Sequence, residues 1–203
     1  MYEVKNQIRG YELFAMETDR LRLSVLKRSR AGEVADYLTR NREFHRKWAQ
    51  THSDSYFTEK TQRDYLKFDA KEYEEGRLVP LWITKKGEPD RIIGRVSFFN
   101  FAYGGMMSCS VGYHLDETET HKAYMTEALS ESCRMLMDVM KMHRIEAFIL
   151  PNNKSSLNLI RRCGFTYEGK RVSYMHINGK WEDHEAFYLL EGTNLPYKNI
   201  LKM

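Results

Sequence analysis

Short runs in which apolar and polar residues alternate recur along the chain and predict β-strands. In residues 20–26, Leu21, Leu23 and Val25 alternate with other side chains, the spacing of a strand with one buried face. Similar runs occupy residues 78–84, 91–101, 107–115 and 145–150, and residues 165–190 read as strands with a hairpin turn at Asn178–Gly179. Gly94 lies inside one run, so we expect a β-bulge or a close backbone approach there.

Between these runs, apolar residues recur at intervals of three and four and predict amphipathic helices. The repeating positions are Ala31, Val34, Ala35 and Leu38 in residues 31–44, and Leu129, Cys133, Leu136 and Met140 in a later segment. Thr58 is placed to cap a very polar helix that Gly76 ends, and a short helix over residues 157–163 stops at Gly164. Interleaved helices and strands predict an α/β arrangement with a mixed sheet.

Composition narrows the class of protein. A chain of 203 residues with 42% apolar content suits one globular domain. The formal charge of +4 is a mild excess of mixed sign, which permits an anionic ligand and gives no expectation of nucleic-acid binding. Without a signal-like or membrane-spanning apolar run, we expect a soluble, cytoplasmic protein. Cys109, Cys133 and Cys163 lack metal-ligand spacing and predict buried free thiols.

The first candidate for chemistry is the step from a strand into the long helix, where the sequence reads THKAYMT. Unpaired N–H groups and the dipole of a helix N-terminus can hold an anion, and residues 121–126 would supply those amides. Lys122 adds a mobile positive charge. The alternative reading is that this stretch is merely the start of a helix.

A second constellation combines Asn153, Ser156, Gly164 and Phe165. An Asn at the end of a strand can pair with the amide groups of an extended ligand. The structural alternative makes Ser155 or Ser156 an N-cap, Gly164 a C-cap residue and Phe165 a core residue.

Together, in this order, these segments resemble the GNAT family of acyl-CoA-dependent N-acyltransferases, specifically its ribosomal-protein-alanine N-acetyltransferase branch. The resembling segments are ETDRLRLSVL, NREFHRKWAQTHSDSYFTE, VGYHLDETETHKAYMTEAL, PNNKSSLNLIRRCGFTYEG and NGKWEDHEAFYLL, and they span roughly residues 17–190. The resemblance implies an α/β (α+β) GNAT fold with a mixed, splayed sheet of about seven strands flanked by helices. It also implies a domain over residues 18–192, a leader over residues 1–17 and a tail over residues 193–203.

The resemblance further implies direct transfer of an acetyl group from acetyl-CoA to an amine, with no metal. The residues it assigns to coenzyme binding are Leu115, His121, Lys122, Ala123, Tyr124, Met125, Thr126 and Asn153. Ser156, with Asn153, takes the catalytic position, where its hydroxyl would protonate the leaving thiolate. Glu43 and Trp48 would line the acceptor pocket. Glu127 fits a structural or dipole role better than a catalytic one.

Two departures from the family pattern bear on mechanism. His121, Ala123 and Met125 stand where glycine, glycine and alanine are common, and a left-handed backbone would cost such residues on the order of 1 kcal/mol each. Ile160 replaces a common tyrosine acid, and Phe148 and Met175 stand where relatives carry glutamate, so no general base is evident.

A missing base favours an acceptor of low pKa, and an α-amine titrates near roughly 7.7–8 against about 10.4 for lysine. We therefore expect the acceptor to be a protein N-terminus, such as that of a ribosomal protein. We also expect the enzyme to be a monomer or homodimer. The alternatives are a small-molecule amine such as a polyamine or antibiotic, and a non-catalytic module that binds acyl-CoA or a partner.

Overall fold

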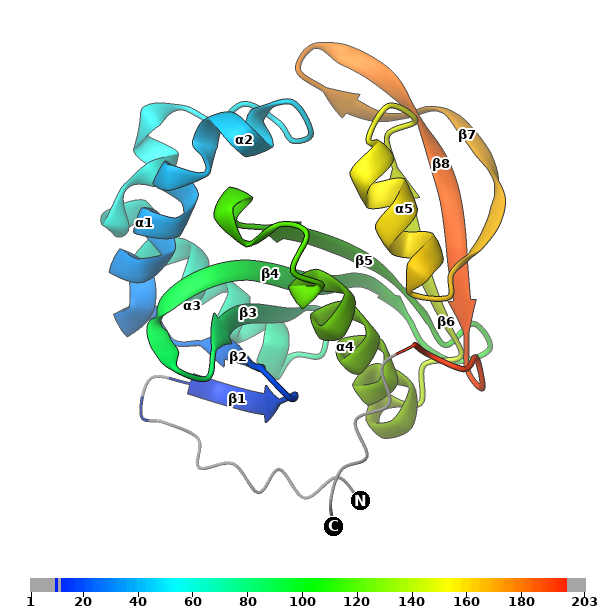
Figure 1. The fold of residues 1–203 in the computed structure, drawn as a ribbon, viewed down its shortest axis with the longest axis horizontal. Helices are drawn as coiled ribbons and strands as arrows, with labels where there is room; N and C mark the ends of the chain where they lie inside the picture. Colours follow the sequence, from blue (N-terminus) through cyan, green and yellow to red (C-terminus); the bar gives the residue numbers. More distant parts are fainter. Residues whose placement is uncertain (1–9, 11, 197–203) are drawn as a thin grey trace.

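The computed structural model describes residues 10 and 12–196 and contains an eight-stranded sheet with helices on both faces (Figure 1). The strands are β1 (Glu12–Glu17), β2 (Leu21–Leu26), β3 (Val79–Lys85), β4 (Glu88–Ala102), β5 (Ser108–Leu115), β6 (Arg144–Ile149), β7 (Thr166–Ile177) and β8 (Lys180–Leu190). The α-helices are α1 (Ala31–Arg40), α2 (Arg42–Arg46), α3 (Glu59–Glu74), α4 (Tyr124–Met140) and α5 (Lys154–Arg162). Short 3₁₀ turns are η1 (Arg28–Arg30), η2 (Asp54–Phe57) and η3 (Glu117–Glu119).

The sheet is mixed, as the sequence pattern predicts. Its strand order is β1-β2-β3-β4-β5-β6-β8-β7, and the single parallel pair among the described strands is β5 with β6. One strand exceeds the expected number of about seven, because β1 forms within the segment taken for a leader and pairs antiparallel with β2. The sheet therefore begins before residue 18. Residues 1–9 and 11 of that leader, and 197–203 of the tail, lie outside the described residues.

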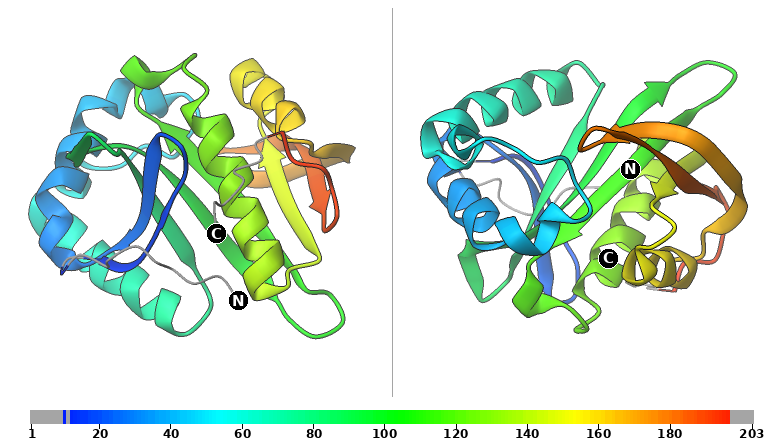
Figure 2. Two further views of the ribbon diagram at one scale, coloured as in Figure 1. Left: turned by 60° about the horizontal axis from the view of Figure 1, so that its bottom comes forward. Right: turned by 90° about the horizontal axis from the view of Figure 1, so that it is seen from above.

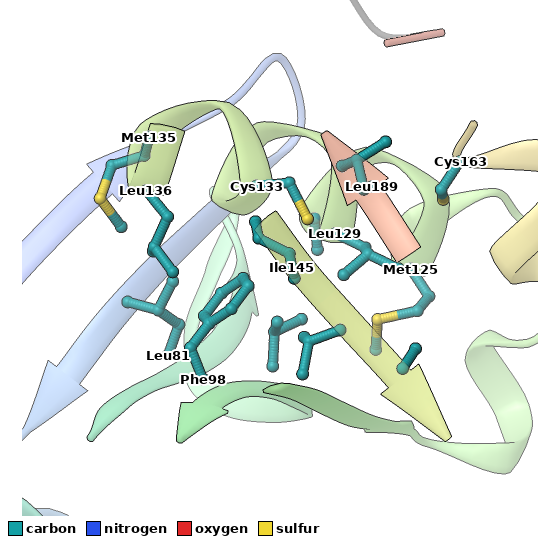
Figure 3. Close-up of a cluster of buried hydrophobic side chains, with 14 of the residues drawn as sticks. Leu81, Phe98, Met125, Leu129, Cys133, Met135, Leu136, Ile145, Cys163 and Leu189 are labelled. Atoms are coloured by element: carbon teal, nitrogen blue, oxygen red, sulfur yellow. The ribbon is translucent and has the colours of Figure 1, made fainter. Parts of the chain in front are cut away.

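Two apolar layers hold the helices to the sheet. Leu21, Leu23 and Val25 of β2 share one face, as their alternation predicts, and belong to the cluster that α4 covers. Figure 3 shows this cluster, in which Leu129, Cys133 and Leu136 of α4 point at the strands. The opposite face packs against α1 and α3 through a second cluster: Leu26, Ala31, Val34, Tyr37, Leu38, Leu66, Trp82 and Ile92. All three cysteines are free and buried, as predicted.

Most local signals in the sequence act where they were expected, but two helices have other bounds. A Cβ on Gly94 would meet the His114 carbonyl oxygen at 2.8 Å, so the backbones approach too closely for a side chain. Asn178 (φ 49°) and Gly179 (φ 86°) make the left-handed hairpin turn. The helix expected over residues 157–163 begins three residues earlier, at Lys154, and ends at Arg162. The other difference is the helix expected over residues 31–44. It ends at Arg40, because the buried Asn41 side chain donates to the Tyr37 carbonyl (2.9 Å) and accepts from the Glu117 amide (2.9 Å).

Candidate active site

β5 and β6 are neighbours for only part of their length. Parallel pairing joins residues 108–110 to residues 144–146, whereas β5 continues to Leu115 and β6 to Ile149. Beyond the paired residues the two strands diverge (Figure 2), so their facing edges have no strand partner in the described chain. A cleft of about 770 Å³ opens along this divergence, a size typical of ligand and cofactor sites.

Nearly all the residues expected to bind coenzyme or acceptor line this one cleft. They are Glu43, Trp48, Leu115, His121, Ala123, Tyr124, Met125, Thr126, Asn153 and Ser156. Lys122 is the exception, because its side chain is not part of the lining and its Nζ pairs with Glu119 Oε2 at 2.9 Å. The mobile charge expected at Lys122 is therefore an ion pair.

The start of α4 adopts the strained backbone that glycine normally supplies. His121 and Ala123 both have φ of 62°, and Ala123 is the left-handed N-cap of the 17-residue helix. Non-glycine residues incur roughly 1–2 kcal/mol each in this conformation. His121, Ala123 and Tyr124 all line the cleft, so the N-terminus of α4 faces it.

Thr126, in the first turn of α4, adds a hydroxyl group suited to bind a ligand. The residue is only 3% exposed and belongs to the cleft lining, and its buried Oγ1 has no hydrogen-bond partner among the described residues. A buried hydroxyl without a partner costs about 1–3 kcal/mol, which a bound acceptor oxygen would recover. Unpaired helix amides, this hydroxyl and the Arg162 guanidinium in the lining form a donor set that fits the diphosphate of acetyl-CoA.

A buried clamp fixes the loop before α4 to the start of β2. The Glu127 carboxylate is fully buried and accepts from Thr18 Oγ1 (2.5 Å), Arg20 N (2.9 Å) and Arg20 Nε (2.7 Å). Arg20 also donates to the Lys122 carbonyl (3.1 Å), and its guanidinium lies 4.5 Å from the centre of the Tyr124 ring. Glu127 is thus the structural group that its position in the sequence favours.

On the other wall of the cleft, Asn153 caps α5. Its Oδ1 accepts from the Ser156 amide (3.1 Å) and from Ser155 Oγ (2.9 Å), so Asn153 is the cap, not either serine as considered from the sequence. Ser156 Oγ lies 2.7 Å from the Tyr113 hydroxyl, a contact that the sequence did not reveal. Burial raises the pKa of Tyr113, so this phenol stays protonated at neutral pH.

The acceptor side is built by α2 and the loop after it. Glu43 is exposed and pairs with Arg46 (3.4 Å), whereas Trp48 is half-buried under Lys47, whose Nζ lies 5.1 Å from its ring centre. Both predicted residues therefore lie at the cleft, with Glu43 at its mouth.

His45 and His114 line the cleft, and the sequence analysis assigned neither of them to the site. His45 Nε2 lies 2.8 Å from the Leu115 carbonyl, so that oxygen is engaged by α2. His114 Nδ1 lies 2.7 Å from the hydroxyl of the buried Tyr37, and the two imidazole rings are 5.3 Å apart. His114 lies in a strand that the sequence predicts, but no periodicity predicts that α2 folds His45 against it.

On its acceptor side, the cleft is bridged by two segments that hydrogen-bond to each other. The loop after α2 contacts the β7–β8 hairpin through Gln50 Nε2 to the His176 carbonyl (2.9 Å) and Thr51 N to Asn178 Oδ1 (2.7 Å). Asn178 Nδ2 returns a bond to the Ala49 carbonyl (3.3 Å). These contacts join segments more than 120 residues apart in the sequence.

The split mixed sheet, with a helix N-terminus at the split, lies in a chain whose residues 20–166 match the acetyltransferase (GNAT) domain. The chain belongs to the GNAT family. This GNAT acetyltransferase is 30% identical over 169 residues to the [ribosomal protein uS5]-alanine N-acetyltransferase of Escherichia coli (strain K12), covering 83% of this chain and 87% of the relative.

Solved structures agree with this assignment. The ribosomal-protein-S5-alanine acetyltransferase from Vibrio fischeri superposes with a TM-score of 0.82 at 27% identity, over 88% of this chain and 97% of that one. Mycobacterium smegmatis RimJ, solved in complex with CoA-disulfide, shares the fold with a TM-score of 0.79 at 21% identity, over 84% of this chain and 82% of that one.

Two further features of the described chain concern its surroundings. None of its helices is long and apolar enough to cross a bilayer. Within the same residues, no group of three or more His, Cys, Asp and Glu side chains is arranged to hold a metal ion.

Proposed function

We propose that this acetyltransferase transfers the acetyl group of acetyl-CoA to the α-amine of a protein N-terminus, such as that of a ribosomal protein. The observation that carries the proposal is the bridge of hydrogen bonds across the acceptor side of the cleft. An internal peptide segment needs an open groove in which to lie, whereas the hydrogen bonds of Gln50, Thr51 and Asn178 bridge that groove. A free chain end can enter beneath such a bridge.

The charge of the cleft supports the same choice. Glu43 is the one carboxylate among its lining residues, and the cations Arg42, Arg46, Lys47 and Arg162 outnumber it. A polyamine carries several positive charges and would meet net repulsion here. This composition argues against the small-molecule alternative in its polyamine form and suits the anionic coenzyme.

The amine's own chemistry is a further support. With a pKa near 7.7–8, roughly a tenth to a sixth of α-amines are neutral at pH 7, whereas less than about 0.1% of lysine amines are. The described cleft offers no buried carboxylate to deprotonate lysine. An α-amine therefore needs less assistance from the enzyme.

Within this proposal, the residues of the two walls have separate tasks. The thioester of acetyl-CoA supplies the activated acetyl group. Backbone amides and Thr126 on the α4 wall would hold its diphosphate, and the Ser156 hydroxyl on the α5 wall would protonate the departing thiolate. Tyr113, 2.7 Å from Ser156, orients that hydroxyl and stays protonated itself. Positioning in this way reduces the entropic part of the barrier.

A thiol-release assay tests the proposal. The acceptors are a peptide with a free alanine N-terminus, the same peptide with a blocked N-terminus and one internal lysine, and spermidine. We expect the free N-terminus to be used with a kcat/KM at least tenfold above the other two. Preference for the lysine peptide or for spermidine would refute it, and the absence of turnover on all three would favour a non-catalytic module.

A further inference from the structure

The hydrogen bond of His45 determines which of its ring nitrogens can accept a proton. Its Nε2 lies 2.8 Å from the Leu115 carbonyl, and a carbonyl oxygen can only accept, so Nε2 carries the hydrogen. In the neutral ring Nδ1 then has a free lone pair. Nδ1 has no partner in the described chain, and the half-buried ring lines the acceptor side of the cleft.

His114 is the obvious competitor, but its tautomer is wrong for the task. Tyr37 is fully buried, and its hydroxyl lies 2.7 Å from His114 Nδ1. Because a buried phenol needs an acceptor and this nitrogen is the only hydrogen-bond partner of the hydroxyl in the described chain, we assign the hydroxyl as the donor and Nδ1 as the acceptor. The neutral His114 ring then carries its hydrogen on Nε2, and neither nitrogen offers a lone pair to the cleft. His114 is instead an uncharged ring that packs against His45, with 5.3 Å between the ring centres.

Burial favours the neutral form of His45 before the acceptor arrives. Burial lowers the pKa of His45, while the Leu115 carbonyl and the carboxylates of Asp116 and Glu117 act in the opposite direction. Burial also lowers the pKa of His114 well below its ordinary value, aided by His45 and Arg95, so the neighbouring ring adds no positive charge at neutral pH.

We infer that His45 Nδ1 is the general base that takes a proton from the incoming ammonium group. This inference rests on the proposed transfer to an amine. The N–H bond of the ammonium breaks and its proton passes to Nδ1, leaving a neutral amine whose lone pair attacks the thioester carbonyl. As the C–N bond forms and the C–S bond breaks, the Ser156 hydroxyl gives its proton to the thiolate sulfur. The nitrogen loses a second proton, which passes through solvent to the Ser156 oxygen and restores its hydroxyl. His45 returns its proton to solvent.

Three variants separate a base from a structural contact. Glutamine can place its amide where Nε2 lies, so His45→Gln keeps the bond to Leu115 and removes the base, whereas His45→Asn is too short and removes both. At pH 7 we expect both variants to lose about 10²-fold in kcat/KM, a typical contribution of general-base catalysis. His143→Gln removes an exposed histidine outside the cleft lining and serves as the control that keeps wild-type activity.

The pH profile provides the deciding readout. Above the pKa of the acceptor, near 7.7–8 for an α-amine, the amine is already neutral, so the defect of both variants shrinks to less than about fivefold at pH 9.5. A defect that is constant with pH, or a Gln variant with wild-type activity beside an impaired Asn variant, would show a structural role and overturn the inference. Calorimetry with CoA verifies that each variant still binds coenzyme.

The same experiment distinguishes failure of the inference from failure of the proposed function. The rates are measured with whichever acceptor the wild-type enzyme uses best. If that acceptor is a small amine, the N-terminal proposal fails. The defect of the His45 variants in kcat/KM should still shrink with rising pH, but only above the pKa of that amine.

Discussion

At the scale of single residues, the pair formed by Ser156 and Tyr113 gives the clearest chemical expectation. Ser156→Ala removes the hydroxyl that would protonate the thiolate, and it is expected to lower kcat roughly 10- to 100-fold while the Kd of CoA stays within about threefold. Stopped-flow thiol release and calorimetry measure the two quantities. Tyr113→Phe keeps the Ser156 hydroxyl and removes one 2.7 Å hydrogen bond. Its loss of kcat should therefore be smaller, about fivefold, which corresponds to about 1 kcal/mol. An Ala variant with unchanged kcat would contradict the role of Ser156.

The left-handed Ala123 gives a second expectation at this scale. Glycine relieves the strain of a φ of 62° but gains entropy in the unfolded chain, so Ala123→Gly should raise the free energy of unfolding by up to about 1 kcal/mol. Urea unfolding measures this change. The matched control is Ala70→Gly in the middle of α3, where the backbone is right-handed and glycine should destabilise by about 1 kcal/mol. Equal destabilisation by both changes would show that Ala123 carries no strain.

At the scale of elements, the join between β2 and α4 depends on one buried carboxylate. Glu127→Gln places an amide group against three donors from Thr18 and Arg20, so we expect it to lower the free energy of unfolding by about 3 kcal/mol. Because Arg20 also holds the Lys122 carbonyl, the affinity for CoA should fall with it. Chemical denaturation and calorimetry test both effects. Glu59→Gln breaks an exposed pair with Arg63 on α3 and should change stability by less than about 0.5 kcal/mol. A Glu127 variant as stable as this control would be inconsistent with the clamp.

The elements also show which parts of the structure can be predicted from sequence. Alternation in β2, the Thr58 cap of α3 and the turn at Asn178–Gly179 depend on local chemistry, and the sequence predicted all three. The resemblance to the family, which rests on the order and spacing of the motifs, assigned residues 121–126 and Ser156 to one site. The contacts of His45 and Tyr113 were missed because they form only when α2 and α5 pack against β5, which no local pattern encodes. β1 was missed because a short edge strand carries little alternation of its own.

At the scale of the whole molecule, the fold consists of two halves that meet at the active cleft. Parallel pairing of β5 with β6 covers only three residues on each strand, so the backbone joins the halves weakly at the sheet. The contacts of Gln50, Thr51 and Asn178 join them again across the acceptor side. Coenzyme binding draws on the α4 and α5 walls, whereas the shape of the acceptor entrance depends on this second join. The two properties should therefore respond to different substitutions.

Asn178→Gly tests that separation. Glycine adopts the left-handed turn at this position without strain but removes the bonds to the Thr51 amide and the Ala49 carbonyl. With about 1 kcal/mol lost for each bond, we expect the KM for an N-terminal peptide to rise roughly 5- to 30-fold and the internal lysine peptide to become a better acceptor. The Kd of CoA should stay unchanged by calorimetry. Asn100→Gly is the matched control, since Asn100 is another exposed left-handed asparagine but lies in β4 outside the cleft lining. An Asn178 variant with the acceptor preference of this control would mean that the bridge does not select chain ends, because the entrance would discriminate equally well without it.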